Sequence, residues 1–213
     1  MEEIINYVLR LVVFNMNDWP LYLYLLMIIS GFLLVSPVGG RFSSKFHSTQ
    51  TRMINGMLLL SFGGYLVSTH TYYIHQKLHE VGGNSGCSAF SVFNCGDVIS
   101  NDAYNADPFF GIPWGILGML AFASIIFILL VLRRSPEDKN IGNWINALFI
   151  IPAMGMLPIL WLIYVEVFEL GVFCQYCTGA HLANLLVLIS SYWIYDIYQS
   201  GLWDNTPINH KST

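Results

Sequence analysis

Five long stretches without Asp, Glu, Lys or Arg constrain this chain more than any other feature. They cover residues 19–40, 53–76, 108–132, 144–165 and 171–195. Each has at least the roughly 20 residues that a helix needs to cross a bilayer. Over the whole chain 55 % of residues are hydrophobic and only 10 % are charged, whereas soluble domains carry about 25 % charge. The sequence therefore predicts an all-α integral membrane protein with five spans.

The segment before the first span is too short to cross a membrane. Residues 4–14 are apolar but include Arg10, which favours an interfacial helix. The chain starts with the acidic residues Glu2 and Glu3, and no small-residue cleavage site follows the apolar segment. These features do not fit a signal peptide.

The Lys and Arg residues predict the orientation of the bundle. Seven of the nine fall on one side, in the loops 41–52 and 133–143 and in the C-terminal tail. Only Arg10 and Lys77 fall on the other side. Since basic loops stay in the cytoplasm, we expect the N-terminus outside, the C-terminus inside, and outer loops at 77–107 and 166–170.

All four cysteines are then predicted to lie at the outer face of the membrane. Cys87 and Cys95 fall in the long outer loop, and Cys174 and Cys177 form a C-x-x-C pair at the head of the last span. Disulfide chemistry belongs on this oxidising side. The gap of seven residues between Cys87 and Cys95 is a poor match to a zinc knuckle. Redox chemistry is therefore the favoured interpretation, with structural disulfides and a metal site as alternatives.

The C-x-x-C pair is predicted to occupy the first turn of a helix. Free N–H groups there favour thiolates, while apolar burial opposes them. On that helix Cys177, His181 and Asn184 are spaced i, i+4 and i+7, so they share one face. A thiol followed by two polar groups on an otherwise apolar helix indicates a site.

Three motifs, in this order along the chain, resemble the vitamin K epoxide reductase family. They are Cys87-x7-Cys95 in an outer loop, Phe110-Gly-Ile-Pro113 entering the next helix, and Cys174-x2-Cys177 opening the last helix. An unrelated quinone-linked disulfide oxidase of bacterial periplasms also has four helices and two cysteine pairs, but there the C-x-x-C pair comes first.

The resemblance covers roughly residues 53–195 and implies that they form the catalytic core, a four-helix transmembrane bundle with the outer loop 77–107. Residues 1–52 would then hold the interfacial segment and one extra N-terminal transmembrane helix, and 196–213 a short cytoplasmic tail. The chain looks like a microbial-type member without a fused thioredoxin domain, since about 18 residues follow the last span and a domain needs at least ~50.

The resemblance also implies a function, that of a membrane thiol-disulfide oxidoreductase supporting disulfide bond formation. Electrons would pass from a separate thioredoxin-fold protein on the outer face, through Cys87 and Cys95, to Cys174 and Cys177. They would then pass to a membrane quinone, which could be menaquinone, ubiquinone or vitamin K. Cys87 would meet the partner, Cys95 would exchange with Cys174, and Cys177 would face the quinone.

Four residues are candidates for quinone contacts. His181 stands where vertebrate members have a tyrosine, Asp107 stands where they have an asparagine, and Phe110 belongs to the motif quoted above. His181 is the first candidate to donate a hydrogen bond to the reduced ring oxygen, with an interhelical hydrogen bond as its competing role. For Asn184 the interhelical role is favoured over ligand contact.

Other classes of function remain open at this point. A vitamin K epoxide reductase of the vertebrate type is the alternative within the family. A non-enzymatic tetraspan-like scaffold could use structural disulfides, but it gives no reason for a second pair on a helix head. A haem or metal protein could use the histidines, although we expect no metal. No sequence feature indicates nucleic-acid binding.

Overall fold

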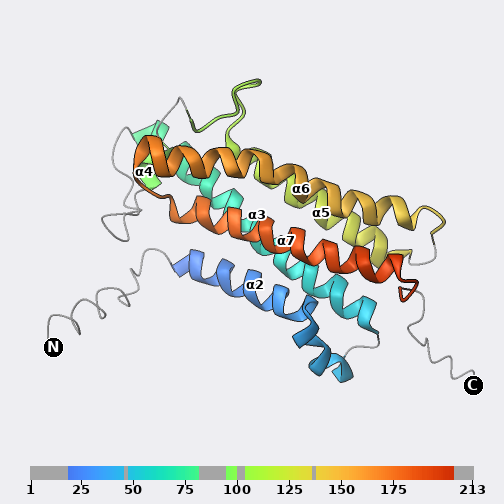
Figure 1. Cartoon of the computed structure of the whole chain (residues 1–213). Coiled ribbons are helices and arrows are strands. Elements are labelled where there is room, and N and C mark those ends of the chain that lie inside the picture. The colour runs from blue at the N-terminus through green and yellow to red at the C-terminus, as the bar shows by residue number, and fades with distance from the viewer. Residues whose placement is uncertain (1–18, 46–47, 82–94, 100–103, 136–137, 204–213) are drawn as a thin grey trace, which may run out of the picture.

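Helices make up nearly all the regular structure in the part of the chain that the structure describes. The computed structural model describes residues 19–45, 48–81, 95–99, 104–135 and 138–203. The elements are α2 (Trp19–Val35), a 3-10 helix η2 (Pro37–Lys45), α3 (Thr49–Val81), α4 (Cys95–Ile99), α5 (Trp114–Arg134), α6 (Ile141–Tyr164), a π-helix η3 (Val165–Leu170) and α7 (Gln175–Gln199). The five long helices run side by side in one bundle (Figure 1). The predicted interfacial segment 4–14 lies outside the described residues.

Three of the described helical segments are long and apolar enough to cross a membrane. They are α5, the continuous segment Ile141–Leu170 formed by α6 and η3, and α7. The helix α2 is also apolar but has only 17 residues. The helix α3 has 33 residues, so at 1.5 Å per residue it is about 50 Å long. The predicted all-α membrane bundle agrees with this architecture, and the count of five spans stays a prediction.

The ends of two helices differ from the predicted spans because of proline. The first helix ends at Val35, not near residue 40. Pro37 disfavours helical backbone at the residue before it, which is Ser36. Buried Arg52 then caps this end, donating from Nη1 to the carbonyl oxygens of Leu34 and Ser36. The helix α5 begins at Trp114, with Pro113 as its N-cap residue, so residues 108–113 precede it as a turn.

The helix α3 is the centre of the bundle, because it packs against α2, α5 and α7. Its contact with α2 is close at Gly31 and Gly56. A Cβ atom at Gly31 would lie 2.6 Å from the Gly56 carbonyl oxygen, and one at Gly56 would lie 2.8 Å from that of Gly31. Small residues that let helix backbones approach in this way are typical of membrane bundles.

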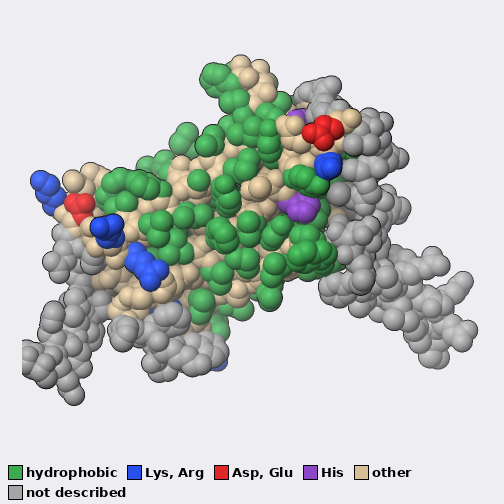
Figure 2. Space-filling view, turned by 180° about the vertical axis from the view of Figure 1, so that it is seen from behind, with side chains coloured by type: hydrophobic (Ala, Val, Ile, Leu, Met, Phe, Trp, Pro, Cys, Tyr) green, Lys and Arg blue, Asp and Glu red, His purple; other side chains and the backbone are tan. Residues whose placement is uncertain are grey.

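The surface of the bundle separates apolar and charged side chains. In Figure 2 the charged side chains gather at the two ends, and apolar side chains cover much of the flank between them. The exposed apolar residues on α5 and α6 include Phe127, Leu130, Met154, Leu157, Leu160 and Trp161. Such a wide apolar flank is the surface that lipid covers in a helical membrane protein.

Candidate active site: thiols at the head of helix α7

The head of α7 is built around Cys174, which is the N-cap residue of the helix. Its backbone is extended (φ −94°, ψ 116°), and its sulfur accepts a hydrogen bond from the Cys177 N–H at 3.3 Å. Gly171, at φ +64°, ends the preceding π-helix and turns the chain into this cap. The cysteine thus replaces the usual Ser or Asp cap, and the helix N-terminus holds its sulfur in one place.

The short helix α4 brings a second cysteine to this point from a distant part of the sequence. The Sγ atoms of Cys95 and Cys174 lie 3.2 Å apart, and both side chains are fully buried. They belong to a small apolar cluster with Leu21, Ile74 and Tyr176. Cys174 and Cys177 are free thiols in this structure. The structure therefore brings together three of the four cysteines that the sequence selected.

Cys177 differs from the other two thiols because it opens onto a cavity. It is partly exposed, and it lines a cavity of about 350 Å³. The wall consists mainly of apolar side chains from α5 and α6, among them Phe122, Ile151, Met154, Ile159 and Leu162. A largely apolar cavity with a few polar groups is typical of a small-molecule site, and such sites measure roughly 300–1,000 Å³.

His181 and Asn184, the two polar residues predicted to share a face with Cys177, also line this cavity. Asn184 is buried, and its Nδ2 donates to the Pro152 carbonyl oxygen on α6 at 3.0 Å. Asn184 therefore forms an interhelical hydrogen bond at the cavity wall. His181 lies one turn from Cys177, where its imidazole can meet the same ligand.

The other two predicted quinone contacts lie in the loop 104–113, which projects from the flank of the bundle as the lime-green hairpin of Figure 1. Asp107 is buried, but its carboxylate accepts hydrogen bonds from the N–H groups of Phe109, Phe110 and Ile112 at 2.9–3.0 Å. The Phe110 side chain is 83 % exposed. Neither residue lines the cavity, whereas Tyr104 and Asn105 from the same loop do.

The negative charge of Asp107 stabilises the turn through these three hydrogen bonds. Burial alone would raise the pKa of its carboxyl, but the three backbone N–H groups outweigh burial and hold the pKa below its usual value. The predicted partner-facing Cys87 lies outside the described residues.

Two further residues at the site were not selected from the sequence. Glu166 is buried (3 % exposed) and lines the cavity beside Cys177. His70, on α3, stacks on the ring of Tyr176 with centroids 4.4 Å apart and planes 11° apart. The position of Glu166 eight residues before Cys174, at the end of an uncharged stretch, was a signal that could have identified it.

The bundle and its buried cysteines define a class, that of helical membrane proteins with a group of cysteines next to an apolar cavity. The chain belongs to the vitamin K epoxide reductase family, since the model of that family matches residues 56–192. Comparison with curated proteins gave no match. The predicted family is thereby confirmed, and membership together with the apolar helices makes this chain a multi-pass membrane protein of an oxidoreductase family.

Proposed function

We propose that this protein oxidises the thiols of a thioredoxin-fold protein on the outer face of the membrane and passes the electrons to a quinone. The observation that carries the proposal is the 3.2 Å contact between the Sγ atoms of Cys95 and Cys174. Cys177, the second cysteine of the C-x-x-C pair, opens onto the cavity. A relay of disulfide exchanges needs this arrangement, because each sulfur must be able to attack the next one. Only the last sulfur, that of Cys177, needs to reach the quinone.

The first transfer takes place in the outer loop. A thiolate of the partner attacks the Cys87–Cys95 disulfide at Cys87, and the second partner thiol then releases Cys87 as the partner becomes oxidised. The loop pair is left as two thiols. Cys95 next attacks the Cys174–Cys177 disulfide at Cys174 and expels Cys177, and Cys87 displaces Cys174 to restore the loop disulfide.

The second transfer takes place at the cavity. The reduced pair of Cys174 and Cys177 loses two electrons and two protons as its S–S bond forms, and a quinone bound in the cavity gains them. The volume and apolar wall of the cavity fit a quinone ring, and Cys177 and His181 supply the polar groups. His181 donates a hydrogen bond to the oxygen on which negative charge develops, and the buried helix cap holds Cys174 in position for Cys177.

The proposal includes the sidedness predicted from the basic residues. The N-terminus and the thiols face outward, the C-terminus faces the cytoplasm, and five spans cross the membrane. A reporter fused after Thr213 should therefore read as cytoplasmic. An external reading would reverse the bundle and place the thiols on the reducing side, which contradicts the proposal.

The decisive experiment mixes purified protein with a reduced thioredoxin-fold protein while quinone absorbance is followed. We expect quinone reduction with matching loss of partner thiols. Substitution of vitamin K epoxide for the quinone tests the alternative of epoxide reduction within the family. A protein that reduces neither would support the scaffold alternative.

Trapping tests the partner. In a Cys95→Ala variant no thiol of this chain can displace the partner from Cys87, and a partner whose second thiol is replaced by alanine cannot release itself. Under oxidising conditions the two should accumulate as a mixed disulfide through Cys87, which mass spectrometry can identify. Adducts that form on Cys174 while Cys87 stays free would contradict the proposed order.

A further inference from the structure

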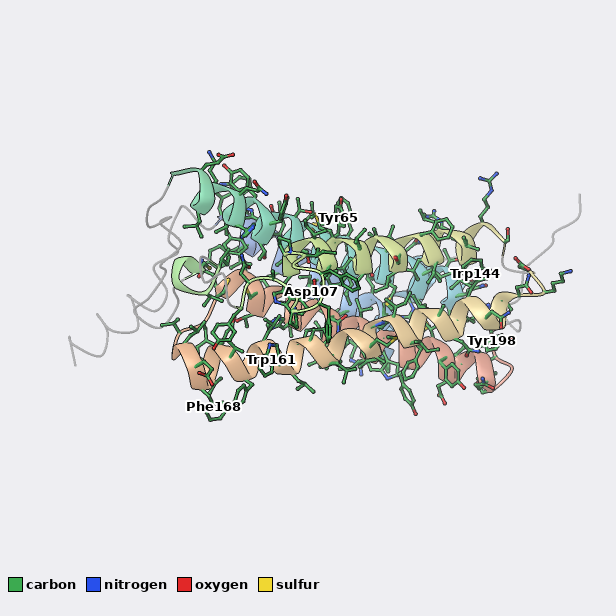
Figure 3. All side chains as sticks on the ribbon, turned by 90° about the horizontal axis from the view of Figure 1, so that it is seen from above. Tyr65, Asp107, Trp144, Trp161, Phe168 and Tyr198 are labelled. Atoms are coloured by element: carbon green, nitrogen blue, oxygen red, sulfur yellow. The ribbon has the colours of Figure 1, made fainter. Side chains whose placement is uncertain are left out.

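Glu166 is a buried carboxyl on a distorted helical turn. It is 3 % exposed, and it lies in the π-helix η3 that continues α6. The neighbouring Phe168 is 73 % exposed, and Figure 3 shows it on the outer side of this turn. A π-helical turn alters which side chains face inward, and such turns occur frequently at functional sites. Here Val165 and Glu166 face the cavity, and Glu169 faces outward.

The contacts of Glu166 are those of a site residue. Its carboxylate accepts a hydrogen bond from the backbone N–H of Cys174, and it interacts electrostatically with Cys177. Both Glu166 and Cys177 line the cavity together with His181. The carboxyl therefore lies beside the C-x-x-C pair, at the wall of the space in which a ligand would bind.

A structural role does not account for an acid at this position. A glutamine would accept the same hydrogen bond from Cys174 without placing a charge in an apolar wall. No Lys or Arg is among the described residues that line the cavity, so no such side chain pairs with the ionised form in this wall. Burial of an unpaired carboxylate is costly, and a carboxyl held in this way can take up a proton when a neighbouring thiol releases one.

We propose that Glu166 is the proton-transfer residue of the cysteine pair. This inference rests on the proposed function, because it concerns the protons of the same reaction. When Cys174 and Cys177 form their disulfide, two S–H bonds break, and two electrons and two protons leave. Glu166 takes the proton of Cys177 as a carboxylate and gives it to a quinone oxygen, so that it ends the cycle as it began. The second proton comes from Cys174 and goes to the other quinone oxygen, so that the quinone leaves as the hydroquinone.

The other titratable groups near Glu166 were compared for this role. Cys174 and Cys177 are the source of the protons, and Cys95 is fully buried in the apolar cluster. Tyr104 lines the cavity from the loop before α5, and His181 lines it from α7. His181 is assigned the hydrogen bond to the developing oxyanion. Glu166 is the group that combines a contact with the backbone of Cys174 and an electrostatic interaction with Cys177.

The test compares Glu166→Gln with Glu169→Gln, a matched control three residues away on the exposed side of the same turn. General acid–base catalysis contributes about 10²–10⁴-fold, so E166Q should lower the rate of quinone reduction about 10²-fold, and E169Q should leave it unchanged. The glutamine keeps an acceptor for the Cys174 N–H, and a thermal unfolding midpoint measures whether the fold is retained. Glu166→Asp, which keeps the carboxyl, should recover part of the rate.

A second readout does not involve the quinone. In a Cys174→Ser background, alkylation of Cys177 by a maleimide is measured against pH in reduced, quinone-free protein. A carboxyl that shares a proton with Cys177 titrates with it as a pair. The profile should therefore show one step fewer in E166Q than in the parent protein, and E169Q should match the parent.

The outcomes separate the two proposals. A wild-type protein that reduces no quinone overturns the proposed function and this inference with it. Wild-type activity that E166Q retains, with an unchanged alkylation profile, overturns the role of Glu166 alone. If E166Q lowers the unfolding midpoint, the E166D variant decides, because recovery of the rate with the carboxyl supports proton transfer and absence of recovery contradicts it.

Discussion

Two segments beside the cavity each bury a carboxylate, and they use it differently. In the loop 104–113 both oxygens of Asp107 are occupied by backbone N–H groups of the same loop. In the π-helix η3, Glu166 accepts one hydrogen bond from the head of α7 and otherwise faces the cavity and Cys177. One carboxylate is directed at its own turn, and the other is directed at the thiols.

The difference shows that burial of an acid does not by itself indicate chemistry. Asp107 satisfies three donors within five residues, so its charge is explained by local structure. Glu166 accepts from a single donor, and no Lys or Arg is among the described residues of the cavity wall. We therefore expect the reaction to take place at α7 and η3, and we expect Asp107 to have a structural role.

Loss of the reacting sulfur should have the largest effect. Cys177→Ala should reduce quinone reduction to the background rate, because Cys177 is the thiol of the pair that opens onto the cavity. The measurement is quinone absorbance with a small dithiol as the electron donor.

Cys87→Ala is the matched control for that measurement, because a small dithiol that reaches Cys174 and Cys177 directly does not need the loop pair. Equal losses in the two variants would contradict the order of the relay. Cys174→Ala should leave the loop pair able to form its disulfide but disconnected from the quinone.

Removal of the imidazole on α7 should have an intermediate effect. His181→Ala should slow quinone reduction by about 10²-fold, the usual cost of losing one donor to a developing oxyanion. Reduction of the Cys174–Cys177 disulfide by a small dithiol should be retained, since that step leaves the quinone unchanged. A variant with normal turnover and a lowered unfolding midpoint would instead assign His181 to helix packing.

The sequence could predict the family, the helical class and the thiols, because each depends on composition or local spacing. The helical period alone places Cys177, His181 and Asn184 on one face, and all three line the cavity. The C-x-x-C pair likewise predicts where the last helix begins. In the structure that helix begins at Gln175, with Cys174 as its N-cap residue.

Features that depend on tertiary contacts could not be predicted in this way. The approach of Cys95 to Cys174 joins residues 79 positions apart, and no local pattern gives that distance. The π-helical turn that directs Glu166 inward has no recognised sequence signal of its own. Phe110 and Asp107 were selected by resemblance to family positions. That resemblance did not predict that backbone N–H groups of the same turn would donate hydrogen bonds to the Asp107 carboxylate.

Substitutions of Asp107 should have the smallest effect on the rate of quinone reduction. They should instead lower the stability of the folded protein, by an amount that depends on pH. Asp107→Ala removes the acceptor of three N–H groups, so it should lower the thermal unfolding midpoint by a few degrees at pH 7. Asp107→Asn keeps an oxygen for Phe109 and Phe110 but loses the acceptor for Ile112. Its effect should be smaller than that of the alanine variant.

The sign of the pH dependence follows from the lowered pKa of Asp107 in the folded protein. Between the folded and unfolded pKa values the unfolded chain binds more protons, so stability falls as pH falls. The stabilising contribution is therefore complete above the unfolded pKa of about 3.9 and is lost as pH drops through the folded value. The wild-type advantage over Asp107→Asn should shrink in that acidic range when unfolding midpoints are compared. If Asp107→Asn instead slows quinone reduction at pH 7 with an unchanged midpoint, Asp107 contacts the quinone and the two carboxylates are alike in function.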